Sequence, residues 1–191
     1  MSQQKELVVT SSQLLTLQWQ FQLTWRLASL HLPALTDEAC LWQPAPGSWT
    51  VRQASDGSWR PDWSVPEPDP APPTTIGWLT WHLIWWWGGL LAALRDEPPP
   101  AHDAVAWPGS ADAVVRQLDS LAAEWADLLA ALDEADLERP LAYPWSEARP
   151  LRLALAWANS ELMKNVAEIG CIRHLFEAFR DASGSQAPVA S

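Results

Sequence analysis

The 191-residue sequence has few basic residues, with 12 Lys and Arg against 23 Asp and Glu and a formal net charge of -11. Nucleic acids and anionic lipid surfaces bind proteins through clustered Lys and Arg side chains. A surface with this excess of carboxylates repels both. The composition therefore predicts that neither a nucleic acid nor a membrane is a partner of this protein.

Cysteine is also scarce, because the chain has only Cys40 and Cys171 and no CxxC motif. The opening stretch MSQQKELVV lacks the basic and then apolar pattern of a secretory signal. These absences exclude a disulfide framework and favour a cytoplasmic location. Cys171 falls within a helical pattern, where we expect a buried thiol that packs as a small hydrophobe.

Apolar residues recur at three- and four-residue spacing in several segments, which is typical of helices with one buried face. The expected helices cover residues 12–31, 75–94, 110–132 and 150–180. No strand pattern competes with them. The sequence predicts an all-α fold, an antiparallel four-helix bundle in a single domain over residues 1–182, followed by a disordered tail over 183–191.

The segment between the first two helices, residues 43–74, is rich in proline and cannot form one regular element. It also carries Trp49, Trp59 and Trp63, which are costly to leave in water. Long loops are usually functional or disordered. We expect this loop to pack over one end of the bundle, where it could close as a lid, rather than to act as a flexible linker.

The second helix contains the uncharged run IGWLTWHLIWWWGGLLAAL, which is long enough to span a membrane. Spanning helices place Trp at the two lipid–water interfaces, whereas Trp81, Trp85 and Trp86 lie in the middle of this run. Its flanks carry prolines and acidic residues without an excess of Lys and Arg. Because the other three helices need an apolar partner, we expect this helix to be buried core.

One face of the second helix combines His82 with Trp78 and with Trp85 or Trp86. A lone imidazole in an aromatic stripe must find a hydrogen-bond partner, and it is commonly a satisfied core residue. The 15 tryptophans exceed what a core of this size requires. Their rigid faces suit a flat or cationic ligand, although rows of Trp are more often packing.

The fourth helix places Glu161, Asn165 and Glu168 at four- and three-residue spacing, so the three side chains share one side. Asn165 replaces an apolar residue of the buried stripe, and a buried amide costs stability unless it is paired. The two glutamates have a simpler interpretation as a solvated helix edge beside Lys164. If the second and fourth helices are neighbours, these groups converge with His82 on one cavity.

The chain resembles the DinB/YfiT-like family of helical bundles, most clearly in the run TIGWLTWHL from Thr75 to Leu83. Three further stretches are similar: LTDEACLWQPAPGSWTVRQ from Leu35, ADLERPL from Ala135 and ANSELMKNVAEIGCIRHLF from Ala158. The resemblance implies a helical bundle that is often a homodimer. In many members the bundle holds a divalent metal with one histidine from the second helix and two from the fourth, and some relatives are thiol-dependent transferases or isomerases.

His82 matches the family's ligand on the second helix, but the fourth helix departs from the family's pattern. Where the family has His-x-x-x-His-x-Gly-Gln/Glu-Ile, this sequence has Glu161-x-x-x-Asn165-x-Ala-Glu168-Ile. An amide oxygen is a weaker ligand than imidazole for transition metals. We therefore expect no metal cofactor, with a harder divalent ion held by His82, Glu161 and Asn165 as the alternative.

The residues support three hypotheses of function. The first is a small-molecule enzyme in which His82, Glu161 and Glu168 are the catalytic acids and bases. The second is a metal-free binding or sequestering protein for an aromatic or cationic small molecule. The third is a metal- and thiol-dependent transferase with an altered site. The candidate substrate-binding residues are Trp49, Trp78, Trp85, Trp86 and Asn165.

Overall fold

The computed structural model describes residues 12–184, and most of this part of the chain is helical. Its helices are α1 (Gln13–His31), α2 (Asp37–Leu41), α3 (Ile76–Leu94), α4 (Ala111–Ala131) and α5 (Leu151–Gly184). The four long helices match the segments predicted from the periodicity, so the predicted helical fold class is confirmed. Residues 183 and 184 of the predicted tail belong to α5, and the remainder of that tail lies outside the described residues.

Side-chain caps explain where four of the five helices begin. Ser12, Thr36, Thr75 and Ser110 each precede a helix and accept a hydrogen bond from the backbone N–H three residues further on. Such caps satisfy donors that the first helical turn leaves without partners, and each contributes about 1 kcal/mol to stability. The fifth helix, α5, begins directly after Pro150, a residue whose fixed backbone angle suits a helix start.

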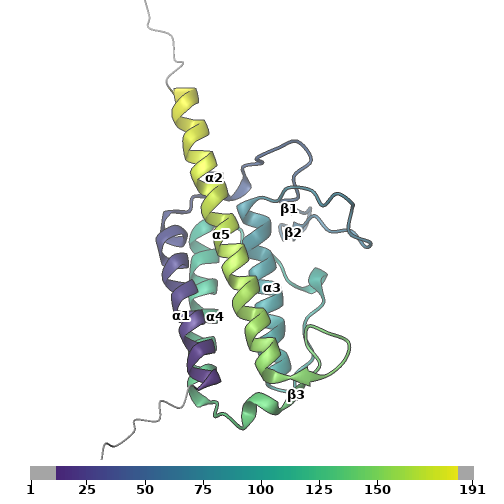
Figure 1. Cartoon of the computed structure of the whole chain (residues 1–191). Helices are drawn as coiled ribbons and strands as arrows, with labels where there is room; N and C mark the ends of the chain where they lie inside the picture. Colours follow the sequence, from purple (N-terminus) through teal and green to yellow (C-terminus); the bar gives the residue numbers. More distant parts are fainter. Residues whose placement is uncertain (1–11, 185–191) are drawn as a thin grey trace, which may run out of the picture.

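The four long helices pack around one core (Figure 1). Helix α1 contacts α5 and α4, and α3 contacts the same two helices from the other side. Helix α3 is buried over most of its length, which confirms the prediction that its apolar run is core. Within residues 12–184, no helix is both long enough and apolar enough to cross a membrane.

The proline-rich segment over residues 43–74 contains a short antiparallel strand pair, which the sequence analysis did not predict. Strand β1 (Val51–Gln53) pairs with β2 (Trp59–Pro61), and Val51 lies opposite Pro61. Farther along, β3 (Pro140–Leu141) pairs with β4 (Arg149–Pro150) just before α5. Strands of two or three residues are too short to show an alternating pattern in the sequence.

The loop is fastened to the bundle by backbone hydrogen bonds. The Trp49 N–H donates to the Pro73 carbonyl at 2.8 Å, and the Thr75 N–H donates to the Trp49 carbonyl at 2.9 Å. The Arg52 guanidinium forms two hydrogen bonds to the Asp62 carboxylate, which spans the strand pair. The two ends of the loop are therefore held together beside the start of α3, as expected for a loop packed on the bundle.

One face of α1 points away from the core and exposes large apolar side chains. We call it the outer stripe, and it consists of Leu15, Trp19, Leu23, Leu27 and Leu30, of which Trp19 is 59% exposed. The spacing of these residues is three and four, so they follow one side of the helix over roughly 22 Å. Cys171 on α5 is exposed as well, which corrects the expectation that its thiol is buried.

Candidate functional site

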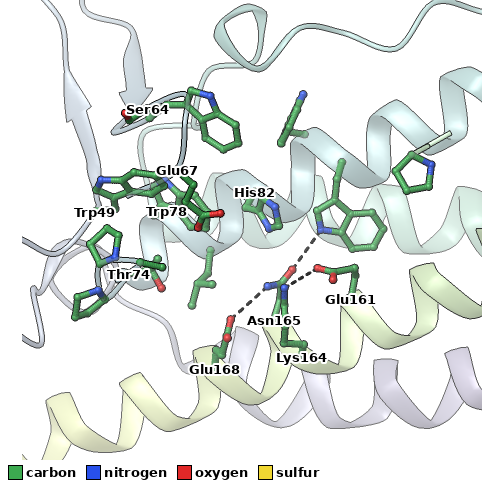
Figure 2. A pocket seen from close by; sticks show the side chains of 18 of the residues that line it. Trp49, Ser64, Glu67, Thr74, Trp78, His82, Glu161, Lys164, Asn165 and Glu168 are labelled. Atoms are coloured by element: carbon green, nitrogen blue, oxygen red, sulfur yellow. Dashed lines mark hydrogen bonds and ion pairs between the residues drawn. The ribbon is translucent and has the colours of Figure 1, made fainter. Parts of the chain in front are cut away.

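A pocket of about 770 Å³ opens between α3, α5 and the proline-rich loop (Figure 2). All eight residues singled out from the sequence as site candidates line it: Trp49, Trp78, His82, Trp85, Trp86, Glu161, Asn165 and Glu168. The second and fourth predicted helices, α3 and α5, are neighbours, because they pack directly on one another. The structure thus brings the candidates together, while their roles stay predictions.

The indole rings of α3 are held in place by hydrogen bonds from their N–H groups. Trp78 Nε1 donates to the Asp62 carbonyl at 2.8 Å, and Trp85 Nε1 donates to the Pro100 carbonyl at 3.0 Å. Trp86 Nε1 donates to Asn165 Oδ1 at 3.2 Å. Because a buried Trp usually needs a partner for this group, these bonds fix the rings as rigid walls.

The loop completes the aromatic wall from the opposite side. The Trp49 ring centroid lies 5.6 Å from that of Trp78, and the Trp63 centroid lies 5.2 Å from that of Trp85. Ring pairs at such distances stabilise each other beyond simple burial, by about 0.5–1.5 kcal/mol. The loop is therefore part of the pocket itself, and its motion as a lid remains a proposal.

The polar wall comes from α5. Asn165 is buried, and its amide accepts from Trp86 Nε1 while Nδ2 donates to Glu168 Oε2 at 3.3 Å. Glu161 Oε2 lies 2.7 Å from Lys164 Nζ, and this pair is partly exposed. Figure 2 shows these side chains on the face of α5 that looks toward His82. The amide is thus satisfied, and the two glutamates lie at the open edge of the cavity.

His82 is a neutral imidazole with an unused nitrogen. Its ring stacks on Trp78, with the centroids 5.0 Å apart and the planes 13° from parallel. Its pKa is lowered to about 4, chiefly by burial and then by the positive charge of Lys164, while Glu161 and Asn165 act in the opposite direction. Its buried Nδ1 has no hydrogen-bond partner within residues 12–184, so the expectation of a satisfied core histidine is wrong for this atom.

The residues at the family's ligand positions do not fit a divalent metal as they lie. Within the described part of the chain, no three His, Cys, Asp or Glu side chains gather in a way that could hold one. Asn165 Oδ1 already accepts a hydrogen bond from Trp86, and Glu161 Oε2 already pairs with Lys164. Lys164 also places a positive charge where a cation would need negative ligands. The alternative of a harder ion at His82, Glu161 and Asn165 therefore finds no support in the geometry.

Several lining residues were missed by the sequence analysis. Tyr143 lines the pocket, and its hydroxyl donates to the Trp86 carbonyl at 2.9 Å. Its ring fits against Gly89, where an added Cβ would lie 2.7 Å from the hydroxyl. Trp157 was detectable, because it precedes Glu161 by one helical turn on the same face. No sequence signal pointed to Tyr143 or to Glu67, since both come from irregular segments.

The comparisons with known proteins agree with this architecture. A solved structure described as the conserved protein of a locus from Enterococcus faecalis is similar, with a TM-score of 0.57 and 13% identity over 84% of this chain and 95% of that chain. At this identity the similarity concerns the fold alone. A search of curated proteins finds no match. The family model of the DinB superfamily matches residues 20–169, which include α3 and the pocket-forming part of α5, and the chain therefore belongs to the DinB superfamily.

Proposed function

We propose that this protein binds a small organic molecule in the tryptophan-lined pocket. The observation that carries the proposal is a cavity of about 770 Å³ whose walls are largely indole rings, with a few polar groups supplied by α5 and the loop. Ligand pockets commonly have this volume, with apolar walls and a few placed polar groups. The His82 ring, which stacks on Trp78 in the same lining, adds a neutral imidazole to the aromatic wall.

The test uses three flat probes of different charge: quinoline, benzyltrimethylammonium and benzoate. Saturation-transfer NMR should show binding of at least one probe to the wild-type protein and its loss in Trp78→Leu. Mass spectrometry should recover the bound probe unchanged. A variant of a tryptophan far from the cavity, Trp19→Leu, is the matched control. If no probe binds, or if both variants behave alike, the proposal is wrong.

Acid–base catalysis in the same pocket is a second candidate function. It is supported by the position of Glu161 and Glu168 on the wall that faces His82. With a pKa of about 4, His82 is neutral at pH 7 and available to accept a hydrogen bond or donate one, but it is a weak base. Turnover of a pocket ligand that disappears in Glu161→Gln while the fold persists would support catalysis. Unchanged turnover in Glu161→Gln and Glu168→Gln would exclude it.

We also propose that the frame of the pocket is an antiparallel four-helix bundle and that a second copy of the chain covers the outer stripe. A net charge of -11 opposes the approach of two copies. Helix α1 contains no Asp or Glu and carries Arg26, so the repulsion is weakest on this face. A two-fold axis would then pair one outer stripe with the other. The two free cysteines agree with the proposed cytoplasmic location.

A further inference from the structure

The ionisable side chains around the pocket carry an excess of negative charge. Glu67, Glu161 and Glu168 face a single basic residue, Lys164, among the described residues that line it. Lys164 already pairs with Glu161, with 2.7 Å between Nζ and Oε2. His82 is neutral at pH 7 and adds no positive charge. An anionic ligand therefore meets no unpaired cation in this lining, whereas a positive ligand meets two further carboxylates.

The walls of the pocket attract positive charge for a separate reason. Six tryptophans line the cavity: Trp49, Trp63, Trp78, Trp85, Trp86 and Trp157. The face of an indole ring is electron-rich, and it attracts a cation placed over it more strongly than the face of Phe or Tyr does. Trp49, Trp85 and Trp157 are only partly buried, so they retain exposed ring surface. Aromatic faces and carboxylates thus favour the same class of ligand.

A small inorganic cation is a poor match for this cavity. Divalent ions need several oxygen ligands within about 2.6 Å, but Asn165 Oδ1 already accepts from Trp86 and Glu161 Oε2 already pairs with Lys164. The cavity of about 770 Å³ is also far larger than a metal ion. Organic cations are different, because weakly hydrated alkyl groups around the nitrogen pack on indole rings without coordinating oxygens. Size and chemistry therefore separate the two kinds of cation.

We propose that the pocket selects organic cations, specifically tertiary or quaternary ammonium groups with small alkyl substituents, over neutral and anionic molecules of the same shape. The inference rests on the proposed function and names its ligand class. The indole walls hold the alkyl groups, Glu161 and Glu168 supply the negative potential from α5, and Glu67 supplies it from the loop.

Three probes of nearly the same shape isolate the effect of charge: choline, 3,3-dimethylbutan-1-ol and 3,3-dimethylbutanoate. Isothermal titration at low ionic strength should give choline an affinity at least tenfold higher than that of the alcohol, and the carboxylate should bind least. Raising the ionic strength should weaken only the binding of choline, since salt screens its attraction to the exposed glutamates. Equal or tighter binding of the alcohol, or no binding of choline, overturns the inference.

A double variant that replaces two carboxylates by amides tests the role of the glutamates on α5. Glu161→Gln combined with Glu168→Gln should weaken choline binding fivefold or more and leave binding of the alcohol unchanged. Asp181→Asn on the exposed C-terminal part of the same helix is the matched control, because it removes a negative charge away from the pocket. Circular dichroism verifies that each variant is folded. An equal loss in the control, or no loss in the double variant, contradicts the assignment.

Ligand binding in the pocket and selectivity for organic cations would be disproved by different results. If benzoate or quinoline binds in a manner that requires Trp78 while choline does not bind, the pocket is a ligand site and only the cation selectivity is wrong. If none of the aromatic or aliphatic probes binds, the proposed function is wrong as well. Choline binding that survives Trp78→Leu unchanged would place the cation elsewhere on the protein and would also overturn the inference.

Discussion

The pocket and the outer stripe of α1 are both rich in apolar side chains, yet they differ in shape and in charge. The pocket is concave, and carboxylates stand at its edge. The outer stripe is the convex side of one helix, and α1 contains no acidic residue. A concave aromatic site with carboxylates at its rim fits a small ligand, whereas a helical face without carboxylates fits another apolar helix. Apolar content alone therefore does not reveal what a surface binds.

Of the changes considered, negative charge added to the outer stripe should have the largest effect, and the property it changes is self-association. Trp19→Glu combined with Leu23→Glu places two carboxylates on each copy, so repulsion and desolvation should weaken self-association more than 100-fold. Sedimentation equilibrium should report a wild-type dimer and a monomeric variant. The same two charges on exposed positions of α4, Gln117→Glu with Ser120→Glu, should leave the dimer intact. A monomeric wild-type protein at about 100 μM would contradict the proposed dimer.

Two buried asparagines on α5 allow the pocket to be compared with the packing of α1, because Asn165 faces the pocket and Asn159 faces α1. Asn165→Leu leaves Trp86 Nε1 without its partner and should lower the free energy of unfolding by about 1–3 kcal/mol. Asn159→Leu removes bonds from Nδ2 to the Leu17 carbonyl and to Gln20 Oε1, and we expect a loss of about 1 kcal/mol. Urea unfolding measures both. Probe binding should change only in Asn165→Leu, and an equal change in Asn159→Leu would refute the distinction.

His82 should make stability depend on pH. Its folded pKa of about 4 is below the ordinary value of 6.5, so the unfolded chain takes up a proton first as the pH falls. The free energy of unfolding should therefore be full above pH 6.5 and decline between pH 6.5 and 4, by about 1 kcal/mol at pH 5.5.

The difference between the wild-type protein and His82→Gln isolates this effect, since every other titrating group is shared. His31, whose pKa is also lowered, is present in both proteins. Urea unfolding at pH 7.5 and 5.5 should show a smaller loss of stability on acidification in His82→Gln than in the wild-type protein. Identical losses in the two proteins would show that the imidazole of His82 is not held in its neutral form.

The long helices were predictable because each has its own periodicity and its own start signal, a side-chain cap for α1, α3 and α4 and Pro150 for α5. Helix α3 begins at Thr75 and α4 at Ser110, and the sequence shows both positions without knowledge of the fold. The strand pair β1–β2 was not predictable, because its three-residue strands depend on contacts such as the ion pair between Arg52 and Asp62. The exposure of Cys171 was missed as well, since a helical pattern does not tell which side of the helix lacks a neighbour.

The site was predictable to the extent that helices carry it. Helical spacing grouped Glu161, Asn165 and Glu168, and the packing of α3 against α5 then placed them opposite His82. Tyr143 and Glu67 could not be found in this way, because the position of a loop residue depends on the whole tertiary structure. The unpartnered nitrogen of His82 is likewise a property of the packed protein. Periodicity identifies the face, and packing decides which polar atoms remain free.

The smallest expected effect comes from Lys164, the one cation among the described residues that line the pocket. Its ion pair with Glu161 is partly exposed, so Lys164→Gln should change the free energy of unfolding by less than about 1 kcal/mol. The substitution removes a positive charge and frees Glu161, so choline should bind about two- to threefold more tightly. Arg116→Gln, on an exposed position of α4, should leave choline binding unchanged. If Lys164→Gln weakens choline binding instead, then Lys164 contacts the ligand directly, and the pocket recognises a group of the opposite charge.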